Sequence, residues 1–284
     1  MDSDARPVWI TGARGLIGHH LARLASEQFT GRRILPITRA EVELTDARAL
    51  QARFEADPPG LVFHCAAMSR SPACRENPTL AHAVNVGVTR QLADLCAGST
   101  LVFFSTDLVF DGTRGNYREE DPTRPLMVYG ETKAAAEAEV LKNPRHLVIR
   151  TSINAGTSPS GDRGFDEEMC NAWRAGKTLR LFGDEFRTPI AAEDTARAVL
   201  ELARLGTTGI VHVAGGERLS RWDVGALIAA RHPELLPKIE RTSLRDFQGG
   251  PRPADVTLDC RKAESILGRP MPRFSDWVAS HPPG

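Results

Sequence analysis

The side chains best suited to acid–base chemistry in this sequence are Thr106, Tyr129 and Lys133. Thr106 closes an apolar run that begins at Leu101, and Tyr129 and Lys133 belong to the later segment Tyr-Gly-Glu-Thr-Lys. A spacing of four residues places the tyrosine and the lysine on one face of a helix. The lysine ammonium would favour the tyrosinate, and Tyr129 can exchange a proton with a substrate oxygen that Thr106 holds by a hydrogen bond. The alternative is a chance pairing on an exposed helix.

A glycine-rich segment near the N-terminus indicates a second kind of chemistry. The apolar run Val8–Thr11 leads into Gly-Ala-Arg-Gly-Leu-Ile-Gly, with glycines at positions 12, 15 and 18. Such glycines suit a tight strand-to-helix turn and a close backbone approach to pyrophosphate, and the helix that follows offers free N–H groups. A plain tight turn is the alternative, but the position between a strand and a helix favours dinucleotide binding. The residues predicted to bind the cofactor here are Gly12, Arg14, Gly15, Leu16, Ile17 and Gly18.

The end of the second predicted strand indicates which dinucleotide is bound. NAD sites usually carry Asp or Glu there for the ribose 2′-hydroxyl, whereas this chain has Arg39, with Arg14 in the glycine loop. Two guanidinium groups suit a 2′-phosphate, so NADPH is favoured over NADH. The alternatives are that both arginines are solvated surface residues, or that Glu41 or Glu43 reaches the ribose.

These motifs lie in an alternation of strand-like and helix-like segments. We expect strands at 8–11, 33–37, 61–65, 101–105, 146–150 and 209–214, with helices between them at about 16–28, 46 onward, 79–96 and 131–141. Such alternation predicts βαβ units, and therefore an α/β, Rossmann-type, doubly wound parallel sheet. In such a fold Thr106 ends a strand at the sheet edge where ligands bind.

The pattern changes after residue 151. A stretch rich in Gly, Ser, Thr, Asn and Pro precedes helical patterns at about 166–175, 194–205 and 220–230, and the proline-containing end looks irregular. We therefore expect a dinucleotide-binding domain over 1–151 plus the returning strand near 209–214. Residues 152–208 and 215–284 are expected to form a smaller C-terminal substrate-binding lobe.

Composition limits the classes of partner. Lys+Arg and Asp+Glu balance at 36 each, so nothing indicates a nucleic-acid partner. The sequence has no apolar run of membrane-spanning length and no signal-peptide pattern, and its five scattered cysteines suggest neither a disulfide framework nor a metal site. We expect a cytoplasmic protein that acts on a small molecule.

Taken together, these motifs resemble the extended short-chain dehydrogenase/reductase superfamily, and within it the dTDP-4-dehydrorhamnose reductase-like group. The resemblance rests on the glycine loop, on His64-Cys-Ala-Ala67, on Ser105-Thr-Asp-Leu-Val-Phe-Asp-Gly112, and on the segment that contains Tyr129 and Lys133. It also includes Arg252-Pro-Ala-Asp-Val256, so it extends over nearly the whole chain.

The resemblance implies roles for particular residues. The implied catalytic residues are Thr106, Tyr129 and Lys133, of which Tyr129 and Lys133 would also contact the cofactor. Further contacts to the dinucleotide would come from Glu43, Leu44, Ala66 and Ala67. The substrate would be contacted by Thr106 and Asp107. Two positions where the group carries aromatic residues hold Leu108 and Ile153 here, and Ile153 is expected on the substrate side. Arg187, in the second lobe, can grip a substrate phosphate or lie on the surface.

The implied activity is reduction of a ketone, on a nucleotide-linked 4-keto sugar, with hydride from the nicotinamide and a proton from Tyr129. Two alternatives stay open: an NAD-dependent sugar-nucleotide epimerase, and a non-catalytic cofactor-binding regulatory subunit resembling the β subunit of methionine adenosyltransferase. Dimers are common in the superfamily, which suggests a homodimer.

Overall fold

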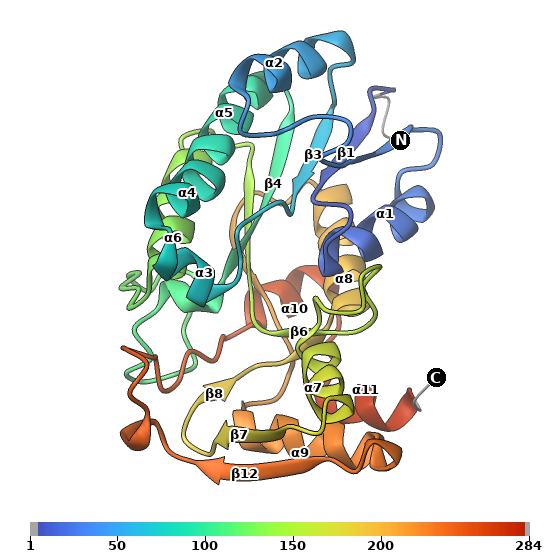
Figure 1. The fold of residues 1–284 in the computed structure, drawn as a ribbon. Helices are drawn as coiled ribbons and strands as arrows, with labels where there is room; N and C mark the ends of the chain where they lie inside the picture. The colour runs from blue at the N-terminus through green and yellow to red at the C-terminus, as the bar shows by residue number, and fades with distance from the viewer. Residues whose placement is uncertain (1–4, 282–284) are drawn as a thin grey trace.

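The computed structural model describes residues 5–281, and its centre is a parallel sheet of six strands in the order β10-β5-β4-β3-β1-β2 (Figure 1). The strands are β1 (Val8–Thr11), β2 (Ile34–Ile37), β3 (Leu61–His64), β4 (Thr100–Thr106), β5 (Leu147–Thr151) and β10 (Gly209–Val213). Pro36 lies within β2 and has no N–H to donate, but β2 is an edge strand, where proline is tolerated. The Rossmann-type α/β fold predicted from the sequence is confirmed.

Helices cover both faces of this sheet because alternate side chains along each strand point to opposite sides. Val8 and Ile10 of β1 share a core cluster with α1 (Leu16–Gln28) and α8 (Ala192–Arg204). Trp9, between them, belongs to a second cluster on the other face. The helices that contribute to this second cluster are α2 (Ala47–Ala56), α5 (Val88–Leu95) and α6 (Val128–Val140).

A third cluster forms the core of the smaller lobe, below the carboxyl ends of the strands (Figure 1). It includes Phe165, Trp173, Val224 and Phe274. Its elements are α7 (Phe165–Arg174), β7 (Thr178–Phe182), α9 (Arg221–Arg231), β12 (Lys238–Thr242) and α11 (Phe274–Ser280). The short strands β6 (Asn154–Ala155), β8 (Phe186–Arg187), β9 (Ile190–Ala191) and β11 (Leu219–Ser220) connect this lobe to the sheet.

The C-terminal part is more regular than the sequence analysis expects. It contains β12, which pairs in parallel with β7, and the helices α10 (Arg261–Leu267) and α11. Helix α8 packs against α1 and so covers the main sheet, although 152–208 was expected in the smaller lobe. The division of the chain into two domains stays a prediction.

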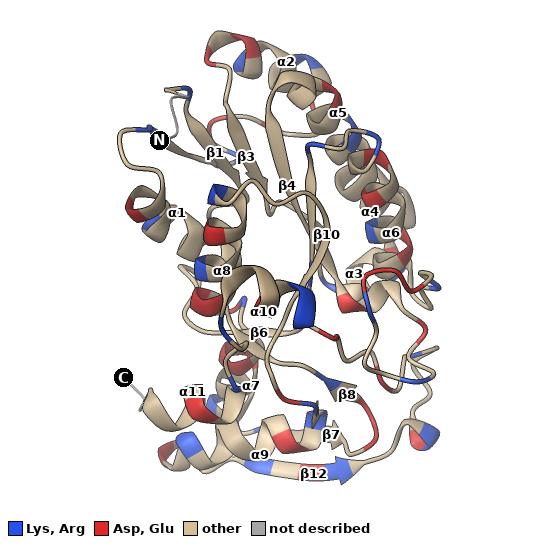
Figure 2. Ribbon diagram, turned by 180° about the vertical axis from the view of Figure 1, so that it is seen from behind, with Lys and Arg blue, Asp and Glu red and all other residues tan. Residues whose placement is uncertain are grey.

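Charged residues of both signs are interspersed on the outer elements, as the alternating blue and red segments of α8 illustrate (Figure 2). Within residues 5–281, no helix is both long and apolar enough to cross a membrane.

Candidate active site

The strand order reverses beside β1, because β2 lies on one side of β1 and β3 on the other. Ligands of open α/β sheets bind outside the carboxyl ends of the strands at such a point. Gly12 turns the chain from β1 with a φ of +67°, and a Cβ there would lie 2.6 Å from the backbone nitrogen of Ala66. A Cβ at Gly18 would overlap the Gly12 carbonyl oxygen. The glycines therefore permit a backbone approach that no other residue allows.

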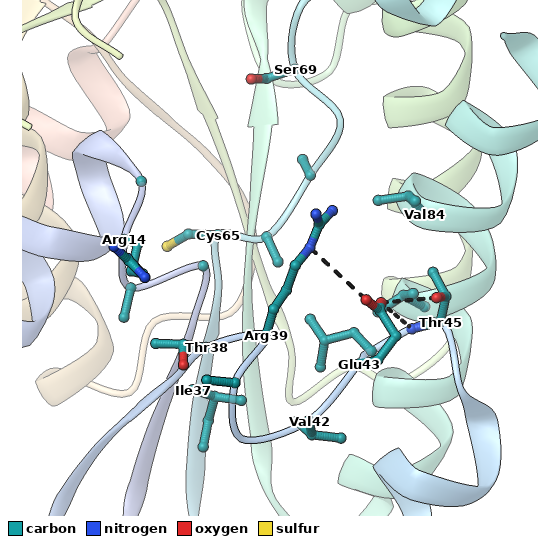
Figure 3. Close-up of a pocket in the computed structure, with 18 of the residues that line it drawn as sticks. Arg14, Ile37, Thr38, Arg39, Val42, Glu43, Thr45, Cys65, Ser69 and Val84 are labelled. Carbon is teal, nitrogen blue, oxygen red and sulfur yellow. Dashed lines mark hydrogen bonds and ion pairs between the residues drawn. The ribbon is translucent and has the colours of Figure 1, made fainter. Parts of the chain in front are cut away.

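A cleft of about 640 Å³ opens at this turn (Figure 3). Its walls come from the first turn, the end of β2, the end of β3, and a loop of the smaller lobe. The predicted cofactor residues that line it are Gly12, Arg14, Gly15, Arg39, Glu43, Leu44, Ala66 and Ala67. Leu16, Ile17 and Gly18 do not line it; Leu16 is buried and Ile17 packs against the first core cluster.

The cleft fits a dinucleotide. Helix α1 begins there with Gly15 as its N-cap, which offers no side chain to the first N–H groups of the helix. Those donors, together with the positive end of the helix dipole, are suited to phosphate oxygens. Apolar side chains at the far side of the cleft, Ile37, Val42 and Val84, suit the flat face of a base.

Arg39 and Glu43 lie together at the end of β2. The Arg39 side chain is 87% exposed and its Nε lies 4.0 Å from a Glu43 carboxylate oxygen, toward which it points (Figure 3). Hydrogen bonds from the backbone N–H and hydroxyl of Thr45 lower the pKa of Glu43, and Arg39 adds to the effect. An ion pair this exposed is weak, so the guanidinium can turn toward a ligand.

Thr106 and Tyr129 meet at the carboxyl end of β4, where the Thr106 side chain is close enough to act on the Tyr129 phenol and partly offsets the rise in its pKa. The Thr106 hydroxyl also donates to Asp107, at 3.1 Å. Helix α6 begins at Val128, earlier than the expected 131, so Tyr129 and Lys133 occupy its first two turns. Burial, with Asp107 adding to it, raises the pKa of Tyr129 above its ordinary value, and the expected favouring of the tyrosinate by Lys133 stays a prediction. The phenol therefore keeps its proton at neutral pH and can act as a donor.

Lys133 is buried next to the cofactor cleft. Its Nζ lies 4.0 Å from the centre of the Phe103 ring, and its charge acts on Cys65, which lines the cleft. Burial lowers the pKa of Lys133 to about 7, against an opposing effect of Glu137. The protonation state of Lys133 near neutral pH therefore depends on the charges of neighbouring groups.

Asp107 and Arg187 form a buried ion pair beside Thr106. Arg187 Nη1 lies 3.2 Å from the Asp107 carboxylate, which also accepts a hydrogen bond of 2.6 Å from Ser152. On its other side Arg187 pairs with Glu185 at 3.0 Å. Arg187 is 4% exposed, so the surface alternative is wrong. The ion pair joins the end of β4 to the smaller lobe, and Arg187 Nε has no hydrogen-bond partner among the described residues.

Ile153 is half-buried and packs against the core of the smaller lobe, with its carbonyl accepting from the backbone N–H of Ile190. Its predicted contact with substrate stays a prediction.

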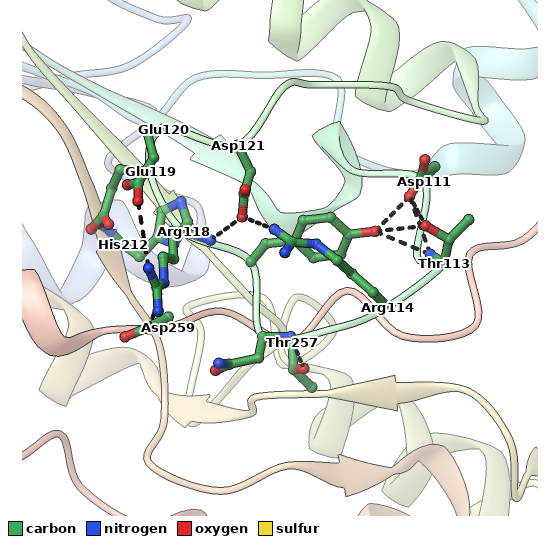
Figure 4. Close-up of polar contacts among 12 residues, drawn as sticks. Asp111, Thr113, Arg114, Arg118, Glu119, Glu120, Asp121, His212, Thr257 and Asp259 are labelled. Atoms are coloured by element: carbon green, nitrogen blue, oxygen red, sulfur yellow. Dashed lines mark hydrogen bonds and ion pairs between the residues drawn. The ribbon is translucent and has the colours of Figure 1, made fainter.

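The segment between Thr106 and Tyr129 is held by a polar network (Figure 4). The Tyr117 hydroxyl donates to Asp111 at 2.5 Å, and the Tyr117 backbone N–H donates to the carbonyl of Thr257 at 2.8 Å. Arg118 lies 3.6 Å from Asp259. These contacts fix the loop to the C-terminal segment and so fix the distance between Thr106 and the start of α6.

Two residues that the sequence analysis missed contribute to the site. Asn85, in the π-helical turn Ala83–Gly87, donates to Thr132 at 2.9 Å and bonds the backbone of Met68 at 2.8 Å, which holds the segment after Ala67 against α6. A π-helical turn is often found at functional sites. Arg163 lines the cofactor cleft from the smaller lobe. No local pattern marks either residue, because each acts through a contact distant in sequence.

His64, by contrast, is a core residue. Its Nδ1 lies 2.7 Å from the Thr11 hydroxyl and its Nε2 lies 3.1 Å from that of Thr89. Burial lowers the pKa of His64 to about 3, so it is neutral, and it ties the ends of β1 and β3 together. Between residues 5 and 281 there is no cluster of His, Cys, Asp and Glu side chains that could hold a metal ion.

The fold and site define an NAD(P)-binding Rossmann protein of the extended short-chain dehydrogenase/reductase type. More narrowly, the chain belongs to the family described as RmlD substrate binding domain, whose model matches residues 6–281.

Three known proteins illustrate what the chain is similar to. The probable low-salt glycan biosynthesis reductase Agl14 of Haloferax volcanii is 32% identical and is matched over 96% of each chain. Methionine adenosyltransferase 2 subunit beta of Pongo abelii is 30% identical over 94% of this chain and 84% of that protein. The crystal structure of a hypothetical dTDP-4-dehydrorhamnose reductase from Sulfolobus tokodaii superimposes with a TM-score of 0.83 at 31% identity, covering 95% of this chain and 98% of that one.

Proposed function

We propose that this protein reduces a ketone with NADPH, and that its substrate is a nucleotide-linked 4-keto sugar. The observation that carries the proposal is the meeting of Thr106 and Tyr129, with Lys133 one turn further along α6, beside a dinucleotide-shaped cleft. Membership of a family that includes sugar-nucleotide reductases supports the substrate class.

The dinucleotide, when bound, supplies the hydride. Thr106 and Tyr129 hold the ketone oxygen by hydrogen bonds, which orient the carbonyl and draw electron density toward that oxygen. As the carbonyl carbon gains the hydride, the π-bond electrons move to the oxygen, and Tyr129 gives this oxygen its phenolic proton. Lys133 holds the ribose by hydrogen bonding and stabilises the tyrosinate that remains until solvent returns the proton.

Asp107 and Arg187 are proposed to contact the substrate beyond its ketone. Both lie at the Thr106 end of the site, and Arg187 Nε has no hydrogen-bond partner among the described residues, whereas Nη1 pairs with Asp107. A guanidinium in that state suits an oxygen-rich group such as a diphosphate or a sugar hydroxyl.

The preference for NADPH is tested by Arg39→Asp. We expect the substitution to weaken NADPH binding by about 10–100-fold, because it removes a charge-assisted bond to the 2′-phosphate and adds a like charge. NADH binding should change far less. Calorimetric titration with both cofactors measures the difference, and Arg48→Asp, an exposed change outside the cleft, is the control. Equal losses for the two cofactors would show that Arg39 does not recognise the 2′-phosphate.

The pH dependence of NADPH binding tests the role of Lys133. Its pKa of about 7 means that the charged form prevails below that pH. If the ribose hydroxyls bind the ammonium, the dissociation constant should be flat below about pH 7 and rise by up to about tenfold per pH unit above it. Titrations between about pH 7 and pH 9 in buffers of different ionisation enthalpy would also detect proton uptake. An affinity and a proton balance that do not change over this range would contradict the assignment.

A regulatory role is the second candidate, because curated relatives of comparable identity include subunits of methionine adenosyltransferase. An epimerase that uses Tyr129 is the third, although Arg39 replaces the acidic residue that such NAD enzymes usually carry. Incubation with NADPH and a panel of nucleotide-linked 4-keto sugars separates the three. A reductase consumes the cofactor in proportion to product, an epimerase interconverts sugars without net consumption, and a regulatory subunit binds NADPH without turnover.

A further inference from the structure

Behind the catalytic lysine lies a buried group of charges that the proposed mechanism does not use. Glu137 follows Lys133 by one helical turn on α6 and is 3% exposed. Arg150, on β5, is 2% exposed and donates to Glu137 twice, from Nε at 3.0 Å and from Nη2 at 2.7 Å. The Ser105 hydroxyl, next to catalytic Thr106, donates to the same carboxylate at 2.5 Å.

The position of this carboxylate is fixed from several sides. The paired bonds from Arg150 match the two carboxylate oxygens, an arrangement with little rotational freedom. Arg150 Nη1 in turn donates to the Glu119 carbonyl at 3.3 Å and lies 3.5 Å from His212 Nε2. His212 is held by a bond from its backbone N–H to the Glu119 carboxylate (Figure 4).

Among the described groups whose charge affects the Lys133 ammonium, Glu137 is the one that carries a negative charge. His64, which ends β3, is neutral, and burial raises the pKa of the thiol of Cys65, which follows it. From α3 (Ser71–Glu76), Cys74 is likewise held as a thiol by burial. On α6, Tyr129 keeps its proton, and from β4 the neighbour is the ring of Phe103.

The other carboxylate near the site, Asp107, forms an ion pair with Arg187 and affects the pKa of Tyr129, so its charge is already neutralised by a partner. Burial alone makes an ammonium unfavourable, so Lys133 depends on a counter-charge.

We propose that Glu137 is a positioning residue for Lys133: its carboxylate, fixed by Arg150 and Ser105, keeps the lysine charged and aimed at the cofactor ribose site. The bidentate pair prevents the glutamate from swinging toward Lys133 and forming a direct salt bridge. The ammonium therefore stays available to a ligand while the negative charge remains behind it. The proposal rests on the proposed function only for the identity of that ligand.

The test is a titration of Lys133 in the folded protein without substrate. With lysine labelled at the ε carbon with carbon-13, the chain gives five signals, and the signal lost in Lys133→Met assigns the residue. The midpoint should lie near 7 in the unsubstituted protein. In Glu137→Gln it should fall by about one pH unit or more, because a carboxylate is lost and Arg150 is left as an uncompensated cation.

Two further substitutions separate charge from packing. Glu137→Asp keeps the charge and should restore the midpoint to near its original value. Glu139→Gln removes the same charge two residues further along α6, where Glu139 pairs with Lys142 at 2.6 Å and with Arg90 of α5, and should leave the midpoint unchanged. NADPH affinity above the midpoint should weaken by about tenfold for each unit by which the midpoint falls.

Loss of one partner from a buried ion pair can prevent folding. Replacing both partners, as in the double variant Glu137→Gln with Arg150→Met, leaves no uncompensated charge and is expected to fold. Its Lys133 midpoint should still lie below that of the original protein.

An unchanged midpoint in either glutamine variant would overturn the proposal, as would a fall in Glu137→Asp equal to that in Glu137→Gln. None of these results depends on turnover. A failure to find a ketone substrate would therefore count against the proposed function and leave this inference standing.

Discussion

Tyr129→Phe is expected to lower kcat for ketone reduction by about 10²–10⁴-fold, because it removes the proton donor and nothing else from the site. The dissociation constant for NADPH should be nearly unchanged, since the phenol ring and the Lys133 ammonium remain. Stopped-flow measurement of dihydronicotinamide absorbance gives the rate of the chemical step, and calorimetry gives the affinity.

The chain offers a matched control for this substitution, because Tyr117 is its other tyrosine. Tyr117→Phe also removes one hydroxyl, but this one donates to Asp111 at 2.5 Å in the loop before α6. It should cost about 1 kcal/mol of stability and retain most of kcat. Similar rates in Tyr129→Phe and the original protein would show that another group donates the proton.

Gly18→Ala is expected to weaken NADPH binding by more than tenfold and to destabilise the fold by about 1–3 kcal/mol. The added Cβ would overlap the carbonyl oxygen of Gly12, so either α1 or the first turn must move away from the cleft. Movement of that turn displaces the N–H groups that are proposed to bind pyrophosphate.

Gly87→Ala serves as the comparison. It is the last residue of the π-helical turn that leads into α5, it has helical backbone angles, and a Cβ there has no atom within 4 Å. It should bind NADPH normally and be as stable as the original protein or slightly more stable. Calorimetry and thermal unfolding measure both properties. Normal NADPH affinity in Gly18→Ala would mean that the close packing at this turn is not needed for the cofactor.

The sequence was sufficient for the main sheet and its first turn. The periodicity of apolar residues in a strand or helix can be seen within a few residues of sequence. The glycines at 12 and 18 are required by the backbone geometry of this strand-to-helix turn, so they too can be recognised from the sequence. Thr106 and Tyr129 were predicted to act on one substrate oxygen, and the structure brings them together because one ends β4 and the other lies in the first turn of α6 at the same edge of the sheet.

The smaller lobe was less predictable because its contacts are distant in sequence. Strands β7 and β12 pair Thr178 with Lys238. Although β7 alternates polar and apolar residues, β12 has Ile239 as its single apolar residue, so its sequence does not mark a strand. The partners of Arg187 could not be foreseen for the same reason, since Asp107 belongs to another domain of the predicted division. Expected features that the structure does not test, such as a homodimer and a cytoplasmic location, stay predictions.

The central claim is that hydride passes from the nicotinamide to a sugar ketone in this site. The most direct measurement uses NADPH deuterated at nicotinamide carbon 4, with a panel of nucleotide-linked 4-keto sugars, followed by mass spectrometry of the sugar. The account predicts one deuterium at the reduced carbon for each NADPH consumed, and none with Tyr129→Phe on the same timescale. Binding of both NADPH and a nucleotide-linked sugar without deuterium transfer to any member of the panel would contradict it.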